Sequence, residues 1–306
     1  MKKLRLSKKI APYVFISPFY LFFAVFGAFP ILFALYLSFF NWDGMNPMQF
    51  VGLENYQFVL TDAWFWDALY NTVSIAIMTT IPQHVIGLLL AFLLTKVVGK
   101  FKSLLRTSYF LPYVIMPVAV AFIFTPFFGF PYGLLNSLVA NILNLPLIGG
   151  LLESLGLTFP LRWTSDPNLI RPSISLLLTW RFTGFNMIIY YAGLQQIPES
   201  LYEAAKVDGA TMFQTFFKVT LPLLRPVMFF AMLMSIIGNL QIFDEPMILV
   251  GLGGGTGRAG QTAMMYMYQT AFNWREFGTG SAMAYIMFFI IIVASLLFNK
   301  FFDREI

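Results

Sequence analysis

Long apolar runs separated by short polar segments make up most of this chain of 306 residues. A helix needs about 20 apolar residues to cross the ~30 Å hydrocarbon core of a bilayer. The pattern predicts six such spans, at about 12–40, 71–95, 107–128, 172–194, 226–243 and 280–299. It therefore predicts an all-α polytopic membrane protein. A basic N-terminal segment, 1–11, is followed by one transmembrane domain over 12–306, with its core at about 68–300.

Two apolar segments need separate interpretation. The first run is far longer than the ~7–15-residue core of a cleavable signal peptide, so it is interpreted as a retained span. Pro18 and Pro30 can kink it, which a membrane helix tolerates when neighbours satisfy the freed backbone groups. The segment 130–156 is interpreted as short interfacial helices in an external loop, because polar residues and a proline interrupt it: Asn136, Asn141, Asn144 and Pro146.

Loop charges predict the orientation of the spans, because cytoplasmic loops carry an excess of Lys and Arg. The N-terminal segment has five bases, Lys2, Lys3, Arg5, Lys8 and Lys9. The loop after the first span has acids and no base, at Asp43, Glu54, Asp62 and Asp67. The next loop has bases and no acid, at Lys96, Lys100, Lys102 and Arg106. This alternation places both termini and segment 202–226 in the cytoplasm, and loops 129–171 and 244–279 outside.

Composition excludes most mechanisms of soluble enzymes. Hydrophobic residues make up 58% of the chain and charged residues 11%, against roughly 25% charged residues in soluble domains. There is no cysteine, which excludes disulfides, thiolate metal sites and cysteine nucleophiles. His84 is the single histidine, and it is interpreted as a packed, hydrogen-bonded residue rather than a proton relay. Topology explains the net charge of +5, so no nucleic-acid partner is expected.

One polar segment, YEAAKVDGATMFQTFFKVTLPLLRP at 202–226, interrupts the apolar pattern. A helix is predicted from Pro198, in its first turn, to about Val207. Leu201, Ala204 and Ala205 share one apolar face of this helix, and Glu203 and Lys206 lie away from it.

A turn and a second helix are predicted to follow. Gly209 permits a sharp turn that a residue with a Cβ would resist. The second helix presents Phe213, Phe216 and Phe217 on one side, and Pro222 is expected to end it. Such a hairpin suits docking into a groove of a soluble partner. The alternative is an interfacial amphipathic linker whose charged residues are simply solvated.

The residues of this segment resemble the EAA loop of binding-protein-dependent ABC importer permeases. The matching positions are Glu203, Ala204, Ala205, Asp208, Gly209, Val219, Leu221 and Pro222, with Val219 where isoleucine is more usual. The resemblance implies a type I ABC importer permease fold with six transmembrane helices. In that fold the cytoplasmic hairpin, here 197–222, fits a cleft on an ATPase and couples its closure to the spans.

The resemblance extends along nearly the whole chain, to carbohydrate-uptake permeases of the maltose and glycerol-3-phosphate type. Segments that carry it include FVGLENYQFVL, GLLNSLVANIL, WTSDP, LQQIPESLYEAAKVDGA and YQTAFNW. The chain is most similar to the first permease of the pair. It departs from that protein in lacking a large second external loop, and from many relatives in its Gly-rich loop, GLGGGTGRAG, where they have a Gly-Gly-Gly-Pro turn.

This resemblance implies a permease subunit, itself not an enzyme, of an ATP-driven importer for a di- or oligosaccharide, with glycerol-3-phosphate as an alternative cargo. The implied partners are ABC ATPase subunits that bind ATP and Mg, a second homologous permease in a heterodimer, and an extracellular solute-binding protein. The implied location is a bacterial or archaeal cell membrane. No cofactor is expected in this chain.

Polar residues at membrane depth are candidates for the substrate path. Matching the maltose-type permeases suggests Gly184, Met187, Gln241 and Asp244 as pocket residues. Polarity adds Asn186 and Asn239, and Phe243 offers a ring face for sugar C–H groups. The alternative for the amides is hydrogen bonding between helices. Arg181 is interpreted as a structural partner of an acid or of carbonyls, and Asp244 and Glu245 can instead be simply hydrated at the interface.

Two other function classes lack support in the sequence. An ion-driven secondary sugar transporter, the main alternative, would need a pathway acid or cation site and usually an inverted repeat. A membrane enzyme would need a cluster of His, Asp or Glu at membrane depth. GTGRAG at 255–260 satisfies G-x-G-x-x-G, but no strand precedes it, and no phosphate-loop motif occurs. It is interpreted as a flexible external element near the solute-binding protein.

Overall fold

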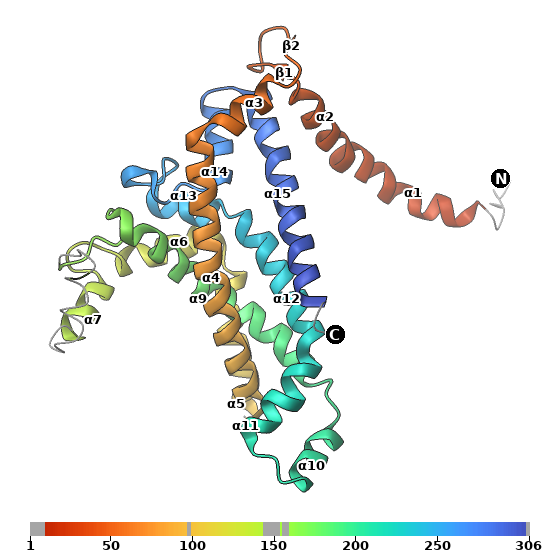
Figure 1. Ribbon diagram of the computed structural model, residues 1–306, viewed down its shortest axis with the longest axis vertical. Helices are drawn as coiled ribbons and strands as arrows, with labels where there is room; N and C mark the ends of the chain where they lie inside the picture. The colour runs from red at the N-terminus through yellow and green to blue at the C-terminus, as the bar shows by residue number, and fades with distance from the viewer. Residues whose placement is uncertain (1–9, 97–98, 143–153, 155–158, 304–306) are drawn as a thin grey trace, which may run out of the picture. The chain divides into compact units, whose positions relative to one another are not determined.

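The computed structural model describes residues 10–96, 99–142, 154 and 159–303, which are almost wholly helical (Figure 1). The basic residues between 2 and 9 lie outside the described residues, as does most of the segment 143–158 at the end of the expected interfacial helices. The chain forms two compact units. The first takes its residues from Met1–Asp62 and Met267–Phe288, and the second from Ala63–Tyr266 and Phe289–Ile306.

The first unit joins the N-terminal helices to the start of the last helix. Its elements are α1 (Ala11–Phe23), a π-helical turn (Ala24–Ala28), α2 (Phe29–Leu37), β1 (Phe40–Asn41), β2 (Gln49–Phe50), α3 (Glu54–Thr61), a π-helical turn (Gln269–Asn273) and the beginning of α15 (Phe277–Asp303). The strands pair antiparallel, with Phe40 opposite Phe50. Asn55 Nδ2 donates to the carbonyls of Ser38 and Phe40, both at 2.9 Å, and so fixes the end of α2.

Two π-helical turns each end two positions before a proline. At Ala24–Ala28 and at Phe216–Thr220 the next residue donates its N–H five positions back, to Ala24 and Phe216 respectively, and Pro30 or Pro222 follows. A proline in an α-helix removes one N–H and clashes with the carbonyl four residues earlier. The wider π turn relieves this clash, so both helices continue past their prolines. The expectation that Pro222 ends its helix is therefore wrong.

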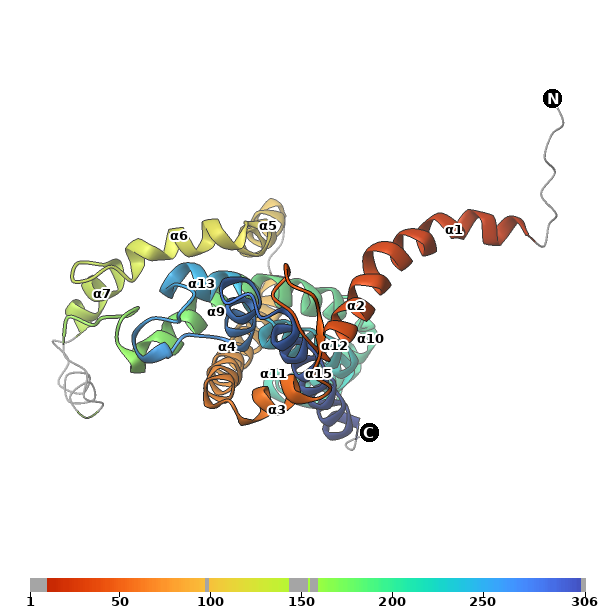
Figure 2. The same cartoon turned by 90° about the horizontal axis from the view of Figure 1, so that it is seen from above.

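The second unit holds most of the helices. They are α4 (Ala63–Lys96), α5 (Lys100–Val114), α6 (Pro117–Phe127), α7 (Leu134–Ile142), α9 (Pro167–Leu194), α10 (Glu199–Val207), α11 (Met212–Thr215), α12 (Leu221–Leu240), α13 (Asp244–Val250) and the last part of α15. A 3₁₀ turn (Thr256–Arg258) follows α13, and α14 (Ala263–Tyr268) leads into the first unit. Seen from above, α5 and α6 follow each other along the side where α13 lies (Figure 2).

Helix α9 is the centre of the second unit, because it packs against α4, α5 and α12. Its buried side chains contribute to two apolar clusters, one around Ile174 and Leu177 and the other around Met187 and Tyr190. Other helices surround α9 on most of its surface, so its polar residues do not have to face lipid.

Among the described residues, four helices are long and apolar enough to cross a membrane: Ala11–Leu37, Ala63–Thr95, Met212–Leu240 and Phe277–Phe302. A fifth candidate is a pair bent by 99°, Phe101–Val114 and Pro117–Phe127. The span expected at 107–128 is therefore broken near its middle. Residues that precede proline avoid the α region, and Met116, before Pro117, has a ψ of 137°. Helix α9 has 28 residues but is too polar to meet the same criterion.

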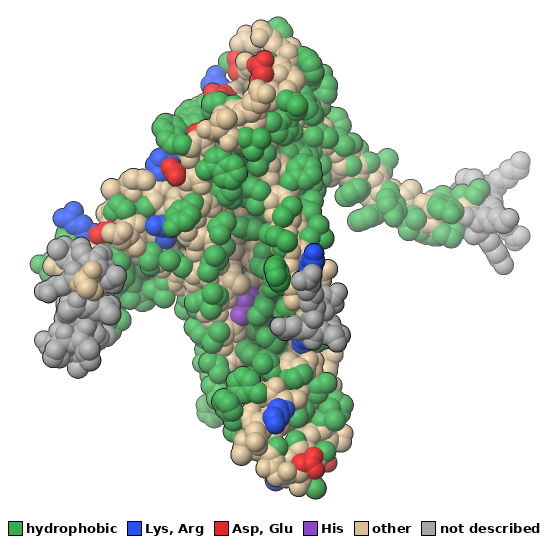
Figure 3. Space-filling view, viewed as in Figure 1, with side chains coloured by type: hydrophobic (Ala, Val, Ile, Leu, Met, Phe, Trp, Pro, Cys, Tyr) green, Lys and Arg blue, Asp and Glu red, His purple; other side chains and the backbone are tan. Residues whose placement is uncertain are grey.

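The second unit has an apolar surface along its helices and charged side chains at its tip. Figure 3 shows hydrophobic side chains covering most of the visible length of α4, and Lys, Arg, Asp and Glu gathered around α10. This distribution is typical of helices that lie in lipid and end in water.

Candidate functional site

Two glycines let three helices approach closely around the middle of α9. A Cβ on Gly184 would overlap the carbonyl oxygen of Tyr109 in α5. A Cβ on Gly87 of α4 would lie 3.2 Å from the Asn186 Cβ and from the Thr183 carbonyl oxygen. Gly184, one of the expected path residues, therefore lies at a contact between helix backbones.

Asn186 and Met187 are enclosed between the helices. Both have an exposed fraction of 0%. Asn186 Nδ2 donates to the Phe182 carbonyl at 3.3 Å, while its Oδ1 is buried with no hydrogen-bond partner among the described residues. Met187 packs in the apolar cluster that also contains Tyr190 and Leu224.

Asn239 joins α12 to α4. Its Nδ2 donates to Thr80 Oγ1 at 2.8 Å, and its side chain is buried. This is the hydrogen bond between helices that the sequence left open as an alternative. A sugar hydroxyl can reach this amide only if the helices separate.

The remaining path candidates lie where α12 ends and α13 begins. Gln241 and Asp244 are exposed, and Phe243 between them is half-buried. The structure therefore divides the expected set into a buried group, Gly184, Asn186, Met187 and Asn239, and a group at the surface, Gln241, Phe243 and Asp244.

Arg181 of α9 forms an ion pair with Glu245 in the first turn of α13. Their side chains are 11% and 6% exposed, so both charges are largely removed from solvent. The interpretation of Arg181 as a structural partner of an acid is confirmed, and simple hydration of Glu245 is wrong. The sequence contained one signal for this pair, because a lone base at membrane depth requires a nearby acid.

His84 is packed, as the sequence predicts. Its Nδ1 lies 2.5 Å from the Tyr190 hydroxyl, and the side chain is 4% exposed. The bond links α4 to α9 one turn away from Asn186.

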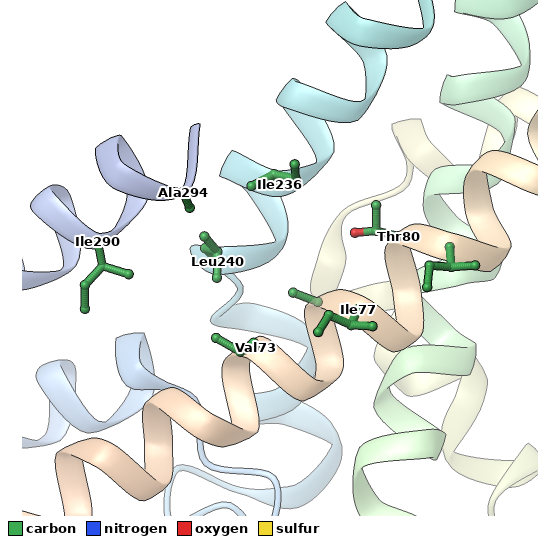
Figure 4. A pocket seen from close by; sticks show the side chains of 9 residues that line it. Val73, Ile77, Thr80, Ile236, Leu240, Ile290 and Ala294 are labelled. Atoms are coloured by element: carbon green, nitrogen blue, oxygen red, sulfur yellow. The ribbon is translucent and has the colours of Figure 1, made fainter. Parts of the chain in front are cut away.

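An apolar pocket of about 310 Å³ lies between α4, α12 and the last part of α15. Figure 4 shows Val73 and Ile77 of α4, Ile236 and Leu240 of α12, and Ile290 and Ala294 of α15 around it. Thr80 contributes a hydroxyl, which accepts the hydrogen bond from Asn239. The lining suits an apolar group and offers almost nothing to sugar hydroxyls.

The EAA segment forms a short exposed helix and a turn. Pro198 is the N-cap of α10, and no residue of α10 is buried. Glu203, Ala204 and Asp208 are exposed, and Ala205 is half-buried.

The turn after α10 passes through Gly209, which has a φ of +75°. This is the left-handed region that glycine enters at little cost, and it agrees with the turn expected there. Thr211 and Gln214 form a capping box that starts α11. Leu221 and Pro222 lie further along the same helical run, which continues to Leu240.

Large apolar side chains surround this turn. The exposed fraction is 87% for Val207, 66% for Met212, 73% for Phe213 and 47% for Phe217. An apolar surface of this kind beside exposed acids is typical of a protein interaction site.

The Gly-rich loop, interpreted from the sequence as a flexible element, makes hydrogen bonds to α4 and within itself. Asn71 Nδ2 donates to the carbonyls of Arg258 and Gln261 at 2.9 and 3.2 Å. Within the loop, the Gly260 N–H donates to the Gly254 carbonyl at 2.8 Å. A Cβ on Gly254 would overlap the backbone of Gln261, so the tight fold of the loop requires glycine there.

Comparisons with known proteins identify the family. A model of the family described as "Binding-protein-dependent transport system inner membrane component" matches residues 83–306. The probable ABC transporter permease protein YurN of Bacillus subtilis (strain 168) is 35% identical over 97% of this chain and 97% of the relative. The arabinooligosaccharides transport system permease protein AraP of the same strain is 33% identical over 96% and 89%. The lactose transport system permease protein LacF of Rhizobium radiobacter is 33% identical over 95% and 92%.

A solved structure shares the fold. It is a chain in the crystal structure of a bacterial ABC transporter involved in the import of the acidic polysaccharide alginate. The TM-score is 0.78 at 23% identity, with 97% of this chain and 98% of that chain covered. From the family match and the relatives together, the chain belongs to the family of binding-protein-dependent transport system inner membrane components.

Proposed function

We propose that this chain is the permease subunit of an ATP-driven importer that carries a carbohydrate, in particular a di- or oligosaccharide. The observation that carries the proposal is the similarity, over 95% or more of the chain, to permeases named for arabinooligosaccharides and lactose. As a permease subunit, the chain is a non-catalytic component. ATP and Mg²⁺ are bound by the partner ATPase subunits.

The proposed topology has six spans in one transmembrane domain over 12–306, with both termini in the cytoplasm. Helix α9 is the sixth span, and its polar residues are tolerated because α4, α5 and α12 surround it. The basic residues at 96–106 and the acids between 43 and 67 support this orientation.

The proposed coupling element is segment 197–222, seated in a cleft of the ATPase. Its support is the exposed helix α10, the left-handed turn at Gly209 and the apolar side chains beside that turn. Charge complementarity through Glu203 and Asp208 adds specificity to such a contact.

The proposed substrate path lies at the interface with a second, homologous permease. Transport along it proceeds by alternating access. Gln241, Phe243 and Asp244 are the residues of this chain that a sugar reaches first, since they lie at the surface. Gly184, Asn186, Met187 and Asn239 join the path when α4, α9 and α12 shift relative to each other. A solute-binding protein delivers the sugar from outside.

The test is the ATPase activity of the reconstituted transporter. The full chain is purified with its associated subunits and placed in proteoliposomes. ATP hydrolysis is then measured with the solute-binding protein, with and without arabinooligosaccharides, lactose or maltose. Stimulation by one sugar is expected. Sugar uptake that follows a proton or sodium gradient, with no ATPase bound to the chain, would establish the secondary transporter instead.

A further inference from the structure

A second pocket, of about 490 Å³, lies where α4 and α9 begin, and the Gly-rich loop lines its third side. Its volume falls in the ~300–1,000 Å³ range of small-molecule sites. The lining includes aromatic, charged and amide side chains: Trp64, Asp67, Tyr70, Asn168, Arg171 and Arg258. None of the residues proposed for the substrate path belongs to it.

The charges of this pocket favour an anion. Arg171 and Arg258 give two positive charges against the single carboxylate of Asp67, a net charge of +1 (2 − 1). Among the described residues, no carboxylate forms an ion pair with Arg171 or Arg258. In the same part of the chain, the Nη2 of Arg258 is buried without a hydrogen-bond partner.

The backbone conformation and the surrounding side chains fix the position of Arg258. Its φ is +58°, a conformation uncommon for residues other than glycine. Its Nε donates to Gln261 Oε1 at 2.7 Å, and its guanidinium carbon lies 4.2 Å from the centroid of the Trp64 ring. Asn71 Nδ2 donates a hydrogen bond to the backbone carbonyl of Arg258. A guanidinium fixed in this way loses little side-chain entropy when it binds a ligand.

Aromatic rings complete the pocket. Trp64 is 52% exposed and Tyr70 is 64% exposed, and the guanidinium of Arg171 lies 5.1 Å from the Tyr70 centroid. Exposed rings offer apolar surface to the C–H face of a sugar, while guanidinium forks match the geometry of a carboxylate.

We infer that this pocket is an outer subsite for a sugar unit that carries a carboxylate. The inference rests on the carbohydrate cargo of the proposed function. It adds a binding site outside the proposed substrate path, and a preference of that site for a negatively charged sugar. A neutral sugar would leave the net charge of +1 in this pocket without a counter-charge. The headgroup of an anionic lipid is the competing source of an oxyanion.

The test is direct binding to the full-length chain in phosphatidylcholine nanodiscs, measured by calorimetry at pH 7. The probes are methyl β-D-glucuronide and methyl β-D-glucoside, which have the same ring and differ in the carboxylate. Wild-type protein is expected to bind the glucuronide about tenfold or more tightly, as expected for a charge-assisted contact. Equal dissociation constants for the two probes would overturn the inference.

Matched variants locate the site. Arg171→Gln and Arg258→Gln are each expected to abolish the preference for the glucuronide and to leave glucoside binding within about twofold. The control is Arg162→Gln, because Arg162 lies over the Phe130 ring at 4.7 Å and does not line the pocket. An equal loss in the control would overturn the assignment. Thermal unfolding in the same nanodiscs identifies any misfolded variant, and Arg171→Met or Arg258→Met, which also removes the charge, then replaces it.

A further measurement with anionic lipid distinguishes a sugar carboxylate from a lipid headgroup as the ligand of this pocket. The binding measurement is repeated in nanodiscs that contain phosphatidylglycerol, where the preference for the glucuronide is expected to persist. Its complete loss there would assign the pocket to a lipid headgroup and overturn the inference. Because this measurement needs neither ATP nor a partner, it is independent of the ATPase test, so failure of the proposed function and failure of the subsite are distinguishable.

Discussion

Arg181 and Glu245, 64 positions apart in the chain, form a largely buried ion pair that joins the middle of α9 to the first turn of α13. Two path candidates, Phe243 and Asp244, directly precede Glu245 in the chain and are thereby held at the start of α13. The pair therefore positions the accessible part of the proposed substrate path.

Removing one partner of this pair is expected to destabilise the protein strongly. Arg181→Met leaves Glu245 buried without a counter-charge, at a cost of about 3–5 kcal/mol. The double variant Arg181→Met, Glu245→Gln removes both charges and is expected to recover most of that stability. Thermal unfolding of the single and double variants in detergent checks this, and a double variant as unstable as the single one would contradict it.

Gly184→Ala is expected to disrupt the contact between α9 and α5, since the added Cβ overlaps the Tyr109 carbonyl oxygen. Overpacking of this kind costs about 1–3 kcal/mol. Gly238→Ala in α12 is the matched control, because a Cβ there has no neighbour within 4 Å. The control is expected to be neutral or stabilising by up to about 1 kcal/mol. Equal melting temperatures for the two variants would show that Gly184 is not at a tight contact.

Gly209→Pro is expected to abolish sugar-stimulated ATPase activity while the chain still inserts into the membrane. The proline ring fixes φ near −65°, whereas Gly209 has a φ of +75°, so the turn after α10 must be rebuilt. No other residue lies within 4 Å of a Cβ at this position, so the damage is expected to stay local. Normal transport by this variant would exclude a coupling role for the turn.

Glu203→Lys is expected to have the same effect through charge reversal on the exposed surface of α10. Glu199→Lys is its control, because Glu199 is also an exposed acid of α10 but is not one of the positions that match the EAA loop. ATPase activity and sugar uptake are measured for both variants at equal membrane expression. Equal loss in both would indicate a general charge effect and not a specific contact.

Tyr190→Phe is expected to weaken the association of α4 with α9 by removing the hydrogen bond to His84. Such bonds between membrane helices contribute about 0.6–1.7 kcal/mol, so a modest fall in melting temperature is expected. Tyr191→Phe is the neighbouring control, because the Tyr191 hydroxyl accepts a bond from Gln195, the residue that caps the end of α9, and the substitution keeps the ring. A larger loss in the control would contradict the assignment.

Several parts of the structure could be predicted from the sequence because they depend on local properties. The lengths of the apolar runs predict the spans at Ala11–Leu37 and Phe277–Phe302. The left-handed turn at Gly209 follows from a glycine after a short helix. Pro117 is itself a local signal for the break before it. The length of the apolar run at 107–128 nevertheless favoured a single span. At Pro222 the local rule failed, because a π turn accommodates the proline.

The environment of each polar residue within the bundle was decided by the tertiary structure. The amino-acid pattern alone shows that Asn186, Asn239 and Arg181 lie in apolar runs, and therefore need partners. It did not determine the partners, because Thr80 is 159 positions from Asn239 and Glu245 is 64 positions from Arg181. Hydrophobic length and turn propensity act over a few residues, whereas the choice of a hydrogen-bond partner depends on which helices pack together. For that reason only the folded chain shows that Gly184 lies against α5 and that Arg171 and Arg258 line one pocket.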